Sequence, residues 1–176
     1  MDVNKKTQRN RFTRMCIGEA IVELMKRDSL DKITVSQIAK KAGISRMTYY
    51  HYYDSKVNAI EDYLREIIIQ YLTENKKRPK EERFMEYSHI LFSIEFFDQY
   101  ATFFIIMERQ GLYSVLVNAM NHFMVELYSD HKDMIYRAYY YAGALLNTFI
   151  NWEKTGKLVS AQDVAKMISE SAPKMP

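Results

Sequence analysis

One short stretch of the chain combines side chains that are suited to binding a polyanion. Positions 46 to 52 read Arg-Met-Thr-Tyr-Tyr-His-Tyr. A helix of this composition is too polar and too aromatic to be buried on all sides. Arginine, threonine, tyrosine and histidine suit phosphates and base edges, and apolar groups suit thymine methyls. The stretch therefore predicts contact with a nucleic acid.

No comparable set of residues points to catalysis. The sequence has no G-x-S-x-G, no phosphate-binding loop and no H-E-x-x-H motif. His89, His122 and His131 lack the paired spacing of a metal site, and no cysteine accompanies them. We therefore expect no enzyme, no cofactor and no metal, and we interpret the lone Cys16 as a small core residue.

The residues before this stretch have the signals of a helix-turn-helix. Thr34-Val-Ser-Gln37 is a capping box that begins one helix, Gly43 supplies the positive φ that ends it, and Ser45 caps the next helix. Two short helices joined by three residues result, which is the arrangement of a helix-turn-helix. The first of them is expected to bury its apolar side, formed by Val35, Ile38, Ala39 and Ala42.

Helices are predicted for the remainder of the chain as well. Only 5 glycines and 3 prolines interrupt a spacing of apolar residues close to 3.6. The fold class is therefore expected to be all-α, an N-terminal three-helix domain followed by a C-terminal helical bundle. The predicted helices outside the motif cover about 9–27, 54 or 55 to 75, 84–97, 99–108, 112–127, 131–154 and 161–169.

Charge divides the chain unevenly. Residues 1–56 hold 12 Lys and Arg against 6 Asp and Glu, whereas residues 57–176 hold 13 against 16. We therefore predict a DNA-binding domain over 1–56, whose last helix runs on to about 75, and a regulatory and dimerisation domain over 57–176. The basic run from Lys5 to Arg14 is expected to stay solvated or to reach a ligand.

The apolar runs are short. The longest ones, Phe103 to Met107 and Tyr139 to Leu146, fall below the roughly 20 residues that span a bilayer. The basic start from Met1 to Arg14 has no apolar segment of the kind that secretory signals contain. A cytoplasmic protein that does not enter a membrane is expected.

The stretch from Ile33 to Lys56 resembles the DNA-binding signature of the TetR family of transcription regulators, without gaps over some 24 residues. The resemblance implies a DNA-reading head in the first third of the chain and a ligand-binding, dimerising helical domain in the rest. Met47 departs from the pattern, since relatives often have glycine there. Tyr141 to Trp152, followed by Gly156, is similar to the ending of a Firmicutes-type C-terminal domain of this family.

The motif assigns expected roles to its residues. Thr34 and Ser36 are expected to touch phosphate, although capping alone also explains Thr34. Lys56 is expected to bind phosphate, because a cation in the first turn of a helix opposes the helix dipole unless an anion lies nearby. The expected DNA-binding set is Thr34, Ser36, Ser45, Arg46, Met47, Thr48, Tyr49, Tyr50, His51 and Lys56.

Within this set the roles differ. Thr48, Tyr49 and His51 are the expected base-edge or methyl contacts, and Arg46 reads guanine or holds a phosphate. Tyr50 is expected to give its hydroxyl to a phosphate while its ring packs. Two further interpretations concern residues outside the set: Tyr53 as core, and Lys40 with Lys41 either as a solvated face or as contacts.

For the second part, the resemblance implies an inducer pocket and a dimer interface. The candidate pocket residues are Phe92, Phe96, Tyr100, Phe103, Phe104 and Met107, for which ordinary core is the competing interpretation. The candidate interface residues are Ala138, Ala142, Leu145 and Phe149. The implied function is a homodimeric repressor on a near-palindromic DNA operator, released by a small ligand. The alternative is a TetR-like coactivator or protein-interaction module without an operator of its own.

Overall fold

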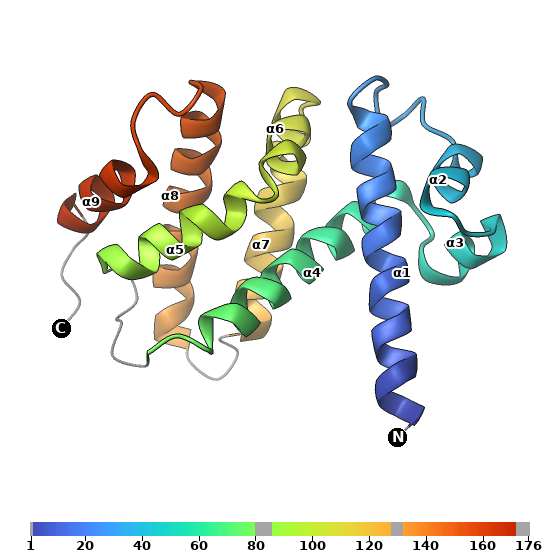
Figure 1. The fold of residues 1–176 in the computed structure, drawn as a ribbon, viewed down its shortest axis with the longest axis horizontal. Helices are drawn as coiled ribbons and strands as arrows, with labels where there is room; N and C mark the ends of the chain where they lie inside the picture. The colour runs from blue at the N-terminus through green and yellow to red at the C-terminus, as the bar shows by residue number, and fades with distance from the viewer. Residues whose placement is uncertain (1, 80–85, 128–131, 172–176) are drawn as a thin grey trace. The chain divides into compact units, whose positions relative to one another are not determined.

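The computed structural model describes residues 2–79, 86–127 and 132–171, and every regular element in these ranges is an α-helix (Figure 1). The expected all-α fold class is therefore confirmed. The helices are α1 (Asp2–Met25), α2 (Val35–Ala42), α3 (Arg46–Tyr52), α4 (Lys56–Asn75), α5 (Tyr87–Asp98), α6 (Ala101–Arg109), α7 (Tyr113–Leu127), α8 (Lys132–Lys154) and α9 (Ala161–Ser171).

The predicted helix ends agree with the structure to within a few residues, except at the start of α1. That helix begins at Asp2 rather than near Arg9. Apolar periodicity reveals only the part of a helix that is buried, and no glycine or proline stops α1 on the N-terminal side of that part. The helix therefore extends beyond its apolar pattern.

Local hydrogen bonds explain why α2 and α3 form where they do. The Thr34 hydroxyl accepts a bond from the Gln37 N–H (3.3 Å), and the Gln37 side chain accepts one from the Thr34 N–H (2.8 Å), which completes the predicted capping box. Gly43 has the left-handed φ of 69° that ends α2. The Ser45 hydroxyl accepts a bond from the Thr48 N–H (3.0 Å) at the start of α3. The capping box, the left-handed Gly43 and the Ser45 cap together fix where α2 begins and ends and where α3 begins.

The helix-turn-helix belongs to a compact unit made of residues up to 68 together with 106–123. Figure 1 shows α2 and α3 beside α1, and α2 packs against both neighbours. The buried apolar residues of this unit include Ile17, Ile21, Met25, Ile38, Ile60, Leu64 and Ile67. This shared core supports the turn from behind.

A close approach of α1 to α4 adds to the same core. Gly18 faces the ring of Tyr63, and a Cβ built on this glycine would lie 2.6 Å from the Tyr63 Cβ. Only a residue without a side chain fits at that position. The glycine therefore sets how near the two helices can come.

Ion pairs tie the same two helices together. Glu66 is buried and receives Arg11 (Nε to Oε2 2.5 Å) and Arg14, whose guanidinium also donates to Asp62 at 3.0 Å. Asp62 in turn accepts the hydroxyl of Tyr53 (2.5 Å). Two arginines of the basic start, expected to be solvated or to reach a ligand, are thus used to hold α1 on α4.

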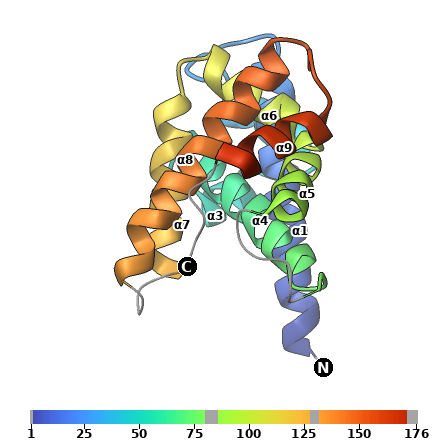
Figure 2. The same ribbon diagram turned by 90° about the vertical axis from the view of Figure 1, so that its left-hand side faces the viewer.

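The second compact unit comprises residues 69–105 and those from 124 onward. Within it α9 packs against α5, as Figure 2 also shows. Aromatic rings fill the interior, with Tyr71 stacked on both Phe92 (centroids 5.5 Å apart) and Phe97 (5.1 Å apart). This unit is therefore a helical bundle with a largely aromatic core.

Within the described ranges, no single helix is both long enough and apolar enough to cross a bilayer. Helices α5 and α6 reach such a length and composition only when taken together, as a pair bent by 73°.

Candidate nucleic-acid interface

Four of the six candidate DNA-binding residues on α3 lie on its exposed side. Arg46, Met47, Tyr50 and His51 are all exposed, with Met47 84% and Tyr50 54% accessible. Thr48 is half-buried, and its hydroxyl lies 2.9 Å from that of Ser45. The structure thus leaves one face of α3 free of the protein's own side chains.

The position of Tyr49 contradicts the role expected from the sequence. It was expected to contact base edges, but its side chain is 1% exposed and its hydroxyl donates to the Ser55 carbonyl (3.2 Å). Burial also raises the pKa of this hydroxyl. Tyr49 is therefore a core residue that anchors α3, and the outward positions belong to Met47 and Tyr50 instead.

Lys56 makes bonds that the sequence did not predict, while its contact with phosphate stays a prediction. Its ammonium group donates to three carbonyl oxygens of the loop before α2, those of Leu30 (2.5 Å), Asp31 (3.1 Å) and Ile33 (2.8 Å). These carbonyl dipoles stabilise the cation at the start of α4, so no bound phosphate is needed to explain it. In this conformation Lys56 closes the loop rather than pointing to a ligand.

The remaining motif residues keep positions consistent with their expected roles. The hydroxyls of Thr34 and Ser45 serve as helix caps, and both residues are exposed, as is Ser36. Tyr53 is buried, as its interpretation as core predicted, and burial followed by its bond to Asp62 raises its pKa. The caps show why hydroxyl residues suit these positions whether or not DNA is bound.

Charge on this region favours a polyanion. From Ile33 to Tyr53 the chain has Lys40, Lys41 and Arg46 but no carboxylate. All three cations are exposed. A surface of one sign next to a protruding helix attracts phosphates at long range. The exposed face of α3 and the positive charge near it therefore both favour the binding of a polyanion.

The six candidate pocket residues lie mainly in the core. Phe103, Phe104 and Met107 are almost completely buried, Phe96 is buried, and Phe92 is half-buried. Tyr100 donates its hydroxyl to the Gln70 side chain (2.6 Å). In this conformation they act as packing residues, which was the competing interpretation. Their role in a ligand pocket stays a prediction.

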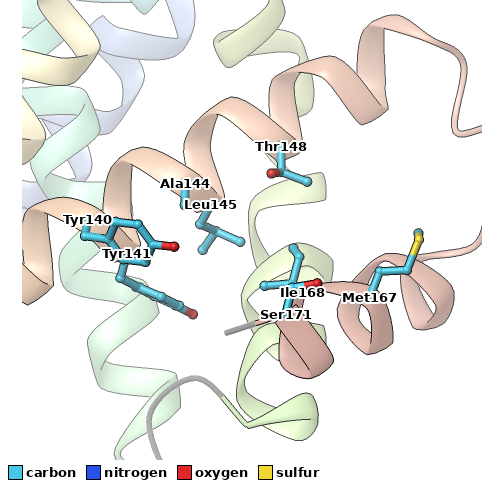
Figure 3. Close-up of a pocket in the computed structure, with 8 residues that line it drawn as sticks. All are labelled: Tyr140, Tyr141, Ala144, Leu145, Thr148, Met167, Ile168 and Ser171. Atoms are coloured by element: carbon cyan, nitrogen blue, oxygen red, sulfur yellow. The ribbon is translucent and has the colours of Figure 1, made fainter. Parts of the chain in front are cut away.

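A groove of about 290 Å³ lies elsewhere, between α8 and α9 (Figure 3). Residues of α8 form one side and residues of α9 the other. The lining consists of Tyr140, Tyr141, Ala144, Leu145, Thr148, Met167, Ile168 and Ser171. Its volume is close to the lower limit of small-molecule sites.

The candidate dimer-interface residues face inward. Ala138, Ala142, Leu145 and Phe149 are all buried within the chain itself. Leu145 nevertheless borders the groove between α8 and α9, and the role of these four residues in a dimer stays a prediction. The outward face of α8 instead carries the exposed Tyr136, Tyr140, Gly143, Ala144 and Asn147.

The second unit also contains a buried polar cluster that was not predicted from the sequence. His89 lies between two tyrosine hydroxyls, that of Tyr71 at Nε2 (3.1 Å) and that of Tyr141 at Nδ1 (3.0 Å). Ser93 lies 2.8 Å from the Tyr71 hydroxyl and donates to the His89 carbonyl (2.8 Å). Burial first, and then the charge of Arg78, lowers the pKa of His89 to about 4, so the ring is neutral at pH 7.

Helical spacing could have placed His89 and Ser93 on one face of α5, but not the tyrosines, which come from distant helices. The structure shows no group of three or more potential metal ligands among the described residues. His131 lies outside the described residues.

Comparison with known proteins supports the same interpretation of the first unit. Residues 17–58 match the family model of the bacterial regulatory proteins, tetR family. No curated protein matches the chain. A solved structure of the fatty acid degradation regulator FadR from Bacillus halodurans is similar, with a TM-score of 0.59 and 17% identity over 89% of this chain and 92% of that one. At this identity, the likeness shows a shared fold.

A capped helix-turn-helix with an exposed cationic surface, in an all-helical chain, defines a DNA-binding transcriptional regulator. Its residues 17–58 are similar to the DNA-binding part of the TetR family. The matched family and the similar structure are regulators rather than enzymes.

Proposed function

We propose that this protein is a repressor that binds a near-palindromic operator as a homodimer and leaves it when a small ligand binds. The observation that supports this most directly is the exposed face of α3, which offers Arg46, Met47, Tyr50 and His51 beside the cations of α2. In a dimer, two such helices enter successive major grooves about 34 to 36 Å apart.

The test is selection of bound fragments from random duplex DNA, followed by titration of the selected site against salt. An enriched site with two related half-sites is expected. In a plot of the logarithm of the affinity against the logarithm of the salt concentration, the slope should be about −0.9 for each phosphate neutralised. Absence of any enriched site would contradict the proposal.

Two variants sharpen this test. Arg46→Ala removes an exposed cation of α3 and is expected to weaken operator binding about tenfold or more, because charge-assisted contacts to base or phosphate contribute about 1–3 kcal/mol. Arg109→Ala is the matched control, since it removes an exposed cation from α6 and is expected to leave operator affinity unchanged.

Dimerisation is proposed through the outward faces of α8 and α9. Tyr140 and Ala144 on α8 and Met167 on α9 are exposed and line the groove of Figure 3. Small and aromatic residues next to a hollow allow helices of a second copy to pack closely. This surface includes the groove bordered by Leu145, one of the residues first expected to form the interface.

Ligand control is proposed to act through the second unit. A ligand that enters the aromatic core around Phe92, Phe96 and Tyr100 would meet the buried hydroxyls of the His89 cluster, which can orient a polar group. The coupling expected between ligand and operator is about 1–3 kcal/mol. A ligand that binds tightly without changing operator affinity would contradict this part.

The coactivator alternative loses its main support. It depended on the aromatic row of α3 as a protein-binding surface, but Tyr49 and Tyr53 are buried and Tyr52 is half-buried, with its hydroxyl donating to Asn10 (3.0 Å). Only Tyr50 of this row is exposed. The exposed face of α3 therefore offers a single tyrosine next to the cation Arg46, rather than a row of aromatic rings.

A further inference from the structure

The outermost part of α3 is formed by two residues. A helix turns by about 100° per residue. Measured from Tyr49, the most buried residue of α3, both Met47 and His51 lie about 160° away, on opposite sides. They are therefore the two side chains that point most directly away from the protein. A single apolar side chain and a single imidazole thus form the leading edge of the helix.

Exposure alone does not give Met47 a role, because isolated apolar residues are common on protein surfaces. Its position does. It lies in the first turn of the second helix of a helix-turn-helix, where contacts to base edges concentrate. An exposed cation, Arg46, directly precedes Met47, and a tyrosine with an exposed side chain, Tyr50, follows it one turn later. When these neighbours reach the DNA, Met47 enters the groove with them.

The chemistry of the side chain then limits what it can recognise. A thioether donates no hydrogen bond and is only a weak acceptor, so the polar edges of the bases offer it little. The apolar feature of the major groove is the C5 methyl group of thymine. An unbranched methionine can adjust its three torsions to cover that methyl group.

We infer that Met47 reads a thymine in each operator half-site by covering its C5 methyl group. The inference rests on the proposed operator binding and identifies one base that the operator contains. A chain with glycine at this position could not make the contact, because glycine has no side chain.

The experiment uses the full-length protein and the site selected from random DNA. Each thymine is replaced in turn by deoxyuridine, which keeps base pairing and the O4 acceptor but lacks the methyl group. For the wild type, one replacement per half-site is expected to weaken binding about fourfold, the value of one buried methyl group. With Met47→Ala the same replacement is expected to have no effect, while sensitivity at other thymines is unchanged.

The control is Leu158→Ala, which likewise shortens a large exposed apolar side chain, outside the DNA-binding motif and outside the lining of the groove between α8 and α9. It should retain the wild-type response to deoxyuridine. Far-ultraviolet circular dichroism checks that the variants are folded, as expected for side chains that are exposed. Equal deoxyuridine responses in the wild type and Met47→Ala overturn the inference alone. Failure to select any site overturns the proposed function, and the inference with it.

Discussion

At the scale of single residues, the side of a helix on which a side chain lies decides its role. Tyr49 and Tyr50 are adjacent and identical in type, yet one anchors α3 in the core and the other is more than half exposed. Lys56 is comparable, because it has the type expected of a phosphate ligand but bonds to carbonyls of its own chain. Residue type indicates what a side chain can do, and its surroundings select among the options.

Replacing Lys56 by methionine tests its structural role. The variant keeps the aliphatic stem but loses the bonds to three carbonyls, so we expect the free energy of unfolding to fall by about 2 kcal/mol. Urea unfolding measures this change, with exposed Lys40→Met as a control expected to change it by less than about 0.5 kcal/mol. The salt dependence of operator binding should stay as in the wild type. If the slope of log affinity against log salt were smaller in magnitude by about 0.9 in the variant, Lys56 would contact a phosphate.

His89 predicts how stability depends on pH. Its pKa is about 4 in the folded state, against 6.5 as its ordinary value, so between these values the unfolded chain binds a proton that the native protein does not. Stability is therefore lost as pH falls from about 6.5 to about 4, by up to about 3 kcal/mol from this residue.

His89→Gln should remove that part of the pH dependence, measured as the difference from wild type in urea unfolding at several pH values. His51→Gln is the control, because His51 is exposed. If His89→Gln and the wild type lose stability in parallel over this range, the buried neutral histidine is not the cause.

At the scale of elements, the contacts between α1 and α4 support the DNA-binding module. Charge and close packing act together there: two arginines of α1 meet Glu66 and Asp62 of α4, and Gly18 allows the helices to touch at Tyr63. Tyr53, which ends α3, bonds to the same Asp62. The end of the recognition helix is thereby connected to this pair of helices.

Removing Glu66 should damage that connection strongly. The side chain is 2% exposed and pairs with two arginines, so Glu66→Ala leaves buried or partly buried cations without their carboxylate. We expect a loss of about 3 kcal/mol in the free energy of unfolding. The exposed pair of Glu23 with Lys26 is the control, and Glu23→Ala should cost less than about 1 kcal/mol. Similar losses of unfolding free energy for both variants would mean that the buried ion pairs of Glu66 stabilise the protein no more than an exposed pair does.

Gly18→Ala tests the close approach of the two helices. The added methyl group would collide with the buried Tyr63, and overpacking of this kind costs about 1–3 kcal/mol even though alanine is the better helix former. Thermal unfolding measures the effect. Glu19→Ala, at the adjacent exposed position, should change stability by less than about 0.5 kcal/mol. A stabilised Gly18→Ala variant would show that the helices can separate at no cost.

At the scale of the whole molecule, the proposed repressor function depends on whether two copies assemble. A near-palindromic operator needs two recognition helices, and one chain supplies one. The exposed face of α8 and α9, within the second unit, is the surface proposed for this assembly.

Tyr140→Asp tests the assembly. Tyr140 is 60% exposed, so the variant should fold, but a carboxylate buried in a dimer interface would cost several kcal/mol. Sedimentation should show a monomer for this variant, in contrast to the dimer proposed for the wild type, and operator affinity should fall about a hundredfold. Val125→Asp, on an exposed position of α7, should remain dimeric. An unchanged sedimentation coefficient for Tyr140→Asp would exclude this surface.

The sequence alone determined the features that depend on neighbours within one or two helical turns. The capping box at Thr34, the left-handed Gly43 and the cap at Ser45 make their bonds to residues at most four positions away, so their pattern is visible in the sequence and is confirmed. The all-helical class and most helix ends follow from the same local signals. These features were sufficient to recognise the DNA-binding motif.

Only the tertiary structure decided which face of each helix is buried. Helix α8 has apolar or small residues on most sides, so periodicity did not distinguish the inner stripe at Ala138 and Ala142 from the outer one at Tyr140 and Ala144. The partners of Lys56 lie more than 20 positions earlier in the chain, and His89 meets Tyr141 from 52 positions away. Contacts between segments so far apart depend on how the helices pack, and no local pattern contains that information.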